Sequence, residues 1–96
     1  MDMIKAMDKL WILLSLRHNY EMRVLANKLR AKVFDFNKFY TDMASEMMLF
    51  SEGTALMAER KYDLIPDWFD ANTSNEAKTL ILSEMNEVMN RQTTSN

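Results

Sequence analysis

The chain has 96 residues, the size of a single domain, and its 48% hydrophobic and 27% charged residues are ordinary for a folded globular protein. It contains one glycine and one proline, whereas a β-sheet protein needs many turn residues, so these counts argue against β architectures and predict an all-α fold. It has no cysteine, which excludes disulfide and thiol chemistry and fits a reducing compartment. The formal net charge is only −2, but the charges are distributed unevenly along the chain.

The first expected element is a helix from about Asp2 to His18, in which apolar residues recur every three or four positions. Its segment 10–16, "LWILLSL", is apolar except for one serine. The acids at positions 2 and 8 cancel the lysines at positions 5 and 9, so the positive start of a signal peptide is missing. Crossing a bilayer takes about 20 apolar residues. We therefore expect a cytoplasmic protein that does not enter a membrane.

The second expected element is a long helix from Met22 to Phe50, a stretch without glycine or proline. Nine apolar residues recur there at intervals of three or four and fall within about 100° on a helical wheel: Met22, Leu25, Leu29, Val33, Phe36, Tyr40, Met43, Met47 and Phe50. This apolar stripe predicts one continuous helix, the longest and central one. Two alternatives remain open: a kink near residues 34–37 ("FDFN"), or a stripe that is simply covered by the two flanking helices.

Gly53 and Pro66 are the chain's two breakers. Gly53 either ends the long helix as a left-handed cap or is tolerated ahead of a further helical segment, 54–62. Pro66 is expected to stop helical structure, because a proline disfavours the helical conformation at the preceding residue, Ile65.

The third expected helix begins after Thr73, which with Glu76 forms the pattern of a capping box. Residues 92–96 read as a polar, frayed tail. We see no internal repeat, so the prediction is a single helical domain, 1–96, with three main helices.

The sequence carries no catalytic or metal-binding pattern. His18 is the only histidine, and between Arg17 and Asn19 it is expected to be a surface or junction residue. No metal-ligand spacing and no glycine-rich phosphate loop is present. We therefore expect neither an enzyme nor a bound cofactor or metal.

The one organised polar feature is a charge asymmetry. Segment 17–38 has six basic and two acidic residues, a net charge of +4, and segment 41–96 has a net charge of −6. On the predicted helix Arg23 and Arg30 border one side of the apolar stripe, and Lys28 and Lys32 border the other. Three interpretations remain open: a solvated rim around a packed seam, a site for an acidic protein partner, or a site for nucleic acid.

Candidate partner-binding residues follow from these basic flanks and from the aromatic residues beside them and beside the proline. Trp and Phe are typical anchors of binding sites, although the "IPDWF" segment (65–69) could equally fold back as a lid over the bundle end. The candidate set is Arg23, Lys28, Arg30, Lys32, Phe34, Phe39, Trp68 and Phe69.

Two DNA-related patterns were compared with the chain. Segment 24–40 contains the Leu-Ala-x-x-Leu opening of a helix-turn-helix, but Arg30 and Ala31 stand where the tight turn needs a glycine or polar break. Segment 61–68, "KYDLIPDW", is similar to the Tyr-Asp-x-Ile-Pro…Trp segment of the Hha family of nucleoid-protein modulators, and this short similarity assigns no family.

The functional prediction is a small non-catalytic protein-binding adaptor or inhibitor of a larger host machine, of the kind that phages and mobile elements encode, acting in the host cytoplasm. Further apolar residues lie off the stripe, which favours a symmetric homodimer of antiparallel long helices. The alternative is a nucleic-acid-binding transcriptional or nucleoid regulator that uses segment 17–38.

Overall fold

The computed structural model describes the backbone of residues 2–31 and 35–94 and the side chains of residues 7–31 and 35–91. Its elements are the α-helices α1 (Asp2–Leu29), α2 (Phe36–Ala58), α3 (Ile65–Ala71) and α4 (Asn75–Thr94), with a 3₁₀ helix, η1 (Tyr62–Leu64), before α3. The described residues form no strand, so the predicted all-α class is confirmed. The predicted count of three main helices and their bounds are not.

The continuous helix predicted from Met22 to Phe50 is wrong. Helix α1 runs through Asn19 without a break and ends at Leu29, and α2 begins only at Phe36. The end of α1 tightens: the amide of Arg30 donates to the carbonyl of Asn27, and the next amide repeats this shorter bond. Asp35 then starts α2 as an N-cap with extended backbone, its carboxylate accepting from the amide of Lys38 at 3.2 Å. The longest helix is therefore the first one.

The apolar stripe led to the wrong prediction because its spacing of three and four residues is the same in a hairpin of two helices as in one straight helix. Leu29 ends α1 and Phe36 opens α2, seven residues later, so the three-and-four spacing passes over the connection. A repeat of seven residues is close to two helical turns. Spacing alone therefore cannot separate one helix from two helices that each carry half of the stripe.

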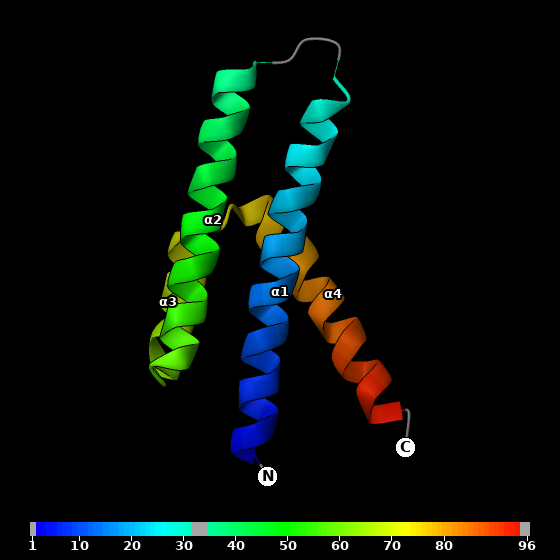
Figure 1. The fold of residues 1–96 in the computed structure, drawn as a ribbon. Helices are drawn as coiled ribbons and strands as arrows, with labels where there is room; N and C mark the ends of the chain where they lie inside the picture. Colours follow the sequence, from blue (N-terminus) through cyan, green and yellow to red (C-terminus); the bar gives the residue numbers. More distant parts are fainter. Residues whose placement is uncertain (1, 32–34, 95–96) are drawn as a thin grey trace.

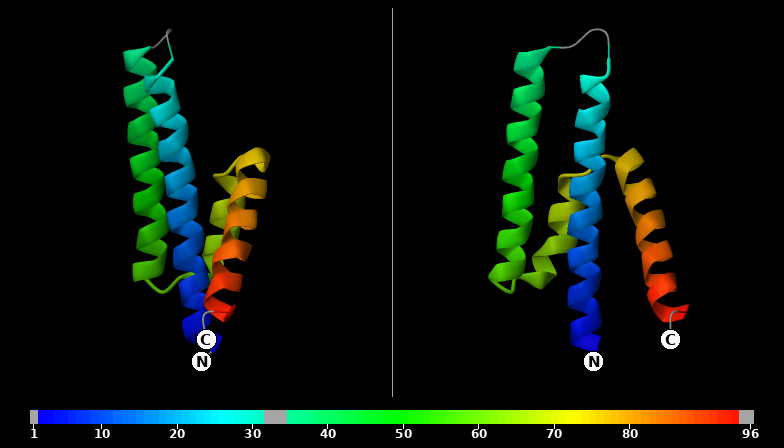
Figure 2. Two further views of the ribbon diagram at one scale, coloured as in Figure 1. Left: turned by 90° about the vertical axis from the view of Figure 1, so that its right-hand side faces the viewer. Right: turned by 45° about the vertical axis from the view of Figure 1, so that its right-hand side comes forward.

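Helices α1 and α2 lie side by side and antiparallel (Figure 1). Helix α3 packs beside the C-terminal half of α2, and α4 runs along α1 on the other side, diverging from it toward its C-terminus (Figure 2). The C-terminal end of α1 and the N-terminal end of α2 extend beyond α3 and α4 in every view. The molecule is accordingly elongated, with extents of 49 × 30 × 20 Å.

The hydrophobic core lies in the broader half of the molecule and consists of two clusters. One joins α1, α3 and α4 around Leu13, Phe69 and Ile81, and the other joins α1, α2 and α3 around Leu14 and Ile65. Trp68 packs against both clusters. The two faces of α1 are thus covered by different partners, which explains why its "LWILLSL" segment is apolar on more than one side.

Gly53 lies inside α2 and ends nothing. A Cβ atom built there would lie 2.9 Å from both Leu14 Cδ2 and Trp68 Cη2, closer than side-chain carbons approach each other in proteins. The glycine therefore allows α1 and α3 to pack directly onto the α2 backbone. Of the two predicted alternatives, the tolerated glycine with continuing helix is confirmed.

Pro66 opens a helix where the sequence predicted an end. Ile65 has helical backbone angles, φ −67° and ψ −42°, and the proline sits in the first turn of α3. Proline is favourable there because its missing amide proton would find no partner in a first turn anyway. Ile65 itself is fully buried, and this burial stabilises the helical conformation of the segment.

The capping box predicted from Thr73 and Glu76 is not formed, because the residue that caps α4 is Ser74 and the third helical position is then Ala77. The hydroxyl of Ser74, not Thr73, accepts from the amide of Ala77 at 3.2 Å. Thr73 is buried and turns its hydroxyl toward Arg17 instead. Helix α4 continues to Thr94, so residues 92–94 are helical rather than part of a frayed tail.

Candidate protein-binding surface

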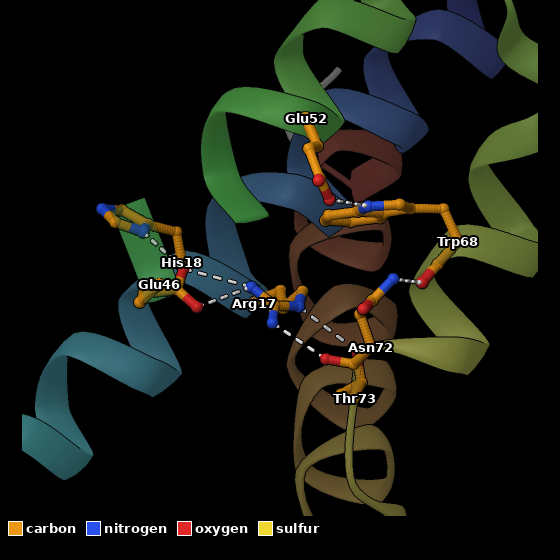
Figure 3. Close-up of polar contacts among 7 residues, drawn as sticks. All are labelled: Arg17, His18, Glu46, Glu52, Trp68, Asn72 and Thr73. Carbon is orange, nitrogen blue, oxygen red and sulfur yellow. Dashed lines mark hydrogen bonds and ion pairs between the residues drawn. The ribbon is translucent and has the colours of Figure 1, made fainter. Parts of the chain in front are cut away.

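Arg17 is a buried charge that joins all parts of the core. From α1 its Nη1 donates to both carboxylate oxygens of Glu46 on α2, at 2.9 and 3.1 Å. Its Nη2 donates to the carbonyl of Asn72 at 2.8 Å, and its Nε to the hydroxyl of Thr73 at 3.3 Å, both in the α3–α4 connection (Figure 3). The two charged side chains are only 2% and 5% exposed. One side chain thus ties three otherwise separate segments together.

Trp68 covers the other side of this arginine. Its ring centroid lies 5.3 Å from Arg17 Cζ, in cation–π geometry, and its indole nitrogen points to Glu52 at 3.4 Å (Figure 3). The side chain of Asn72 donates to the carbonyl of Trp68 at 2.8 Å and fixes the end of α3. No buried side-chain polar atom among the described residues lacks a partner. A buried charge so fully satisfied is typical of a structural network.

His18, predicted to be a surface or junction residue, lies in the middle of α1 and packs against α2. Its Nδ1 is 2.8 Å from the second carboxylate oxygen of Glu46, and its ring stacks on Phe50 at 4.1 Å between centroids. The side chain is 20% exposed. Since it supports Glu46 from the side opposite Arg17, it belongs to the same network.

The basic side chains of segment 17–38 are mostly paired with acids of the same chain. Arg23 lies 3.2 Å from Glu84 on α4, and Lys28 and Lys38 lie 3.0 and 3.4 Å from Asp42 on α2. Arg30 is exposed and forms no ion pair with a described residue. The charge asymmetry of the sequence is therefore largely complementarity within the fold.

A small polar cavity of about 240 Å³ lies between α1 and α2 beside Arg17. Its wall includes Glu21, whose pKa is raised above the usual value chiefly by burial, with Arg17 opposing the rise and Glu46 adding to it. Across the cavity, the hydrogen bond from Lys28 is the main cause that lowers the pKa of Asp42. Among the described residues no group of three or more side chains is placed to hold a metal ion.

The predicted aromatic anchors do not form a surface together. Phe39 and Phe69 are buried, and Trp68 is partly buried over the Arg17 network. The "IPDWF" segment therefore contributes Ile65 and Phe69 to the core as part of helix α3, which packs beside α2. Lys32 and Phe34, also in the candidate set, lie outside the described residues.

A row of exposed apolar side chains lies on α2. Helix α2 turns Phe39, Glu46, Gly53 and Met57 toward the core. Centred about 75° away on the helical wheel lies a row that we term the α2 stripe, formed by Phe36, Tyr40, Met43, Met47 and Phe50. Phe36, Tyr40 and Met47 are 62%, 61% and 52% exposed. Half of the stripe predicted to be covered thus faces solvent in the single chain.

No charge interrupts this side of α2. Its only charged residues are Lys38, Asp42, Glu46 and Glu52. On the wheel each lies at least about 80° from the centre of the α2 stripe. Small and neutral residues border the stripe instead, Ala44, Ser51 and Thr54 among them. Leu29 continues the apolar surface onto α1. His18 on α1 stacks on Phe50 of the stripe, and Leu29 lies eleven residues, about three helical turns, further along the same face of α1. Leu29 is 55% exposed.

Besides the polar cavity and the α2 stripe, an apolar hollow lies between α1, η1, α3 and α4. It measures about 450 Å³ and is lined mainly by Leu10, Leu13, Tyr62, Pro66 and Met85. Lys9 and Asp63 stand among these lining residues.

Sequence reasoning missed Arg17 and Glu46 because it treated charged residues as surface residues. A signal was present: Arg17 follows Leu10 and Leu14 at helical spacing, and Glu46 stands midway between Phe39 and Gly53 at intervals of seven. When each of two helices carries one charged residue at a position of its apolar face, and the two charges are opposite, a buried ion pair between them is indicated.

No protein-family model, curated protein sequence or solved structure matches this chain. Within the described residues no helix has both the length and the apolar character that crossing a membrane requires.

Proposed function

We propose that this protein is a non-catalytic protein-binding protein, an adaptor or inhibitor of a larger machine, and that it binds through the α2 stripe. The observation that carries the proposal is the contiguous apolar surface around Phe36, Tyr40 and Met47, with no charge beside it. Contiguous exposed apolar patches of several hundred Å² mark interaction sites in soluble proteins. Methionine suits such a surface because its flexible side chain adapts to different partners.

The arrangement of charges favours this proposal over the nucleic-acid alternative. Arg17 is buried, Arg23 faces Glu84, and Lys28 and Lys38 share the carboxylate of Asp42. Phosphate binding needs basic side chains that release counterions on contact with the nucleic acid, and neutralised ones release few. The same pairing weakens the expectation of an acidic partner.

An origin in a phage or mobile element and a cytoplasmic location stay predictions.

The proposal is tested by affinity capture from a lysate of the native cell with three baits: the wild-type chain, Met47→Glu and Met48→Glu. Met47 lies in the α2 stripe, and Met48 is the matched control, because it is similarly exposed but lies about 100° further round the helix. We expect specific proteins with the wild type and Met48→Glu, and none with Met47→Glu. Capture that is unaffected by Met47→Glu would contradict the proposed surface.

A parallel measurement addresses the alternative. Fluorescence anisotropy with random-sequence duplex DNA and with single-stranded RNA should show no binding at physiological salt. A steep, linear fall of log affinity with log salt concentration, together with loss of binding in Arg23→Glu and Arg30→Glu, would instead establish a nucleic-acid-binding protein.

A further inference from the structure

We propose that the α2 stripe binds the α2 stripe of a second copy of this chain, with the two helices antiparallel and crossing near residue 45. This inference rests on the proposed function, because it assigns a second copy of the chain to the same surface, where it competes with any other protein partner. It also replaces the dimer predicted from the sequence, which paired long continuous helices that the chain does not have.

The first argument is charge. A two-fold symmetric contact sets the same surface against itself, so any charge near its centre would meet the same charge of the partner. The four charged residues of α2 all lie away from the stripe, on the side toward the core or on the far side of the helix. An uncharged face is suited to pairing with itself, whereas a partner of opposite charge would find nothing to recognise.

The second argument is spacing. Positions 36, 40, 43, 47, 50 and 54 are symmetric about residue 45, since each pair of them lies equally far before and after it. In an antiparallel pair centred there, Tyr40 lies opposite Phe50 of the second copy, and Met43 lies opposite Met47. Four methionines then meet at the crossing point, with an aromatic pair on either side. The antiparallel direction also aligns the two helix dipoles favourably.

The third argument is area. A large side chain such as a Phe or Tyr presents about 200 Å² when fully exposed. With the exposed fractions of Phe36, Tyr40, Met47 and Leu29, each copy then offers about 400–500 Å² of apolar surface. Two copies bury about 800–1,000 Å² from these side chains alone, just below the lower limit of about 1,000–1,200 Å² for specific interfaces. Met43 and Phe50 contribute the remainder, and the expected dimer dissociates in the micromolar range.

The test is sedimentation equilibrium of the purified chain from about 1 to 200 µM, a range that brackets a micromolar dissociation constant. We expect the apparent mass to rise from that of the 11.3 kDa chain toward twice that value. Met47→Glu should weaken the dimer at least tenfold, because two added carboxylates meet at the crossing point. Met48→Glu adds the same charge outside the stripe and should dimerise like the wild type. Circular dichroism of both variants checks that their folds are intact.

The outcomes separate the inference from the proposed function. A wild-type chain that stays monomeric throughout this range, while Met47→Glu abolishes capture of another protein, would overturn the dimer and leave the proposed function standing. A dimer that Met47→Glu and Met48→Glu weaken equally would overturn the inference, because the contact then lies elsewhere. A dimer sensitive to Met47→Glu alone supports it.

Discussion

Arg17 shows how much a single charged residue can contribute to this fold. Its guanidinium reaches Glu46, Asn72 and Thr73 from one position on α1, so the hairpin and the α3–α4 connection share one network. Such a pair adds little net stability relative to apolar residues of the same size, because its desolvation cost is high. Breaking only one side of it is costly, because the remaining charge stays buried.

We expect Arg17→Met to lower the free energy of unfolding by about 3–5 kcal/mol, because Glu46 stays buried with only His18 beside it. The double variant Arg17→Met, Glu46→Leu should lose clearly less. Urea unfolding at neutral pH measures both values. Arg23→Met is the control, since its pair with Glu84 is exposed and contributes about 0–1 kcal/mol. Equal losses in the single and double variants would contradict this account, because a buried Glu46 left without Arg17 would then cost no more than a leucine in its place.

The packing of the helices depends on the absence of a side chain at Gly53. An exposed Gly→Ala change inside a helix stabilises it by about 1 kcal/mol, because alanine has the higher helix propensity. At Gly53 the added methyl group meets Leu14, which is 1% exposed, and Trp68, which the Arg17 network holds in place. The helices must then separate slightly.

Gly53→Ala should therefore destabilise the protein by up to about 2 kcal/mol, the usual cost of overpacking after the gain in helix propensity is subtracted. Thermal unfolding followed by circular dichroism measures the change. Ser51→Ala, at an exposed position of the same helix, serves as the control and should be neutral or slightly stabilising. A higher melting temperature for Gly53→Ala would mean that α1 and α3 do not contact the α2 backbone closely.

The helices themselves could be predicted from the sequence in type but not in bounds. The scarcity of glycine and proline identified an all-α chain, and the apolar spacing located helical residues correctly throughout 22–29 and 36–50. The turn between them carries neither glycine nor proline. Asp35 could be recognised in the sequence as a capping residue, but the unbroken apolar spacing argued more strongly for a continuous helix. Contacts between the two helices, such as that of Lys28 with Asp42, are not visible in the sequence. The reversal of the chain is decided by those tertiary contacts.

At the scale of the whole molecule, the basic residues and the apolar stripe are not exposed and buried in the way the sequence suggested. From the sequence, the basic residues beside a packed apolar seam could be a solvated rim or a binding surface, with Arg23, Lys28 and Arg30 among the binding candidates. The fold pairs most of the basic residues internally and exposes half of the seam on α2. Composition could show that both features exist, but which one faces solvent depends on the hairpin.

The pairing of two α2 helices is tested most directly by disulfide cross-linking, since the chain has no cysteine of its own. Tyr40→Cys and Phe50→Cys chains are mixed and oxidised under mild conditions, and each variant is also treated alone. We predict a disulfide-linked dimer in the mixture, because these positions face each other in the antiparallel pair. Neither variant should link to itself, since each position lies about 15 Å along the helix axis from its own copy, beyond the Cα separation of about 7 Å that a disulfide spans. Efficient self-linking of Tyr40→Cys, or a mixture that forms no mixed dimer, would contradict the account.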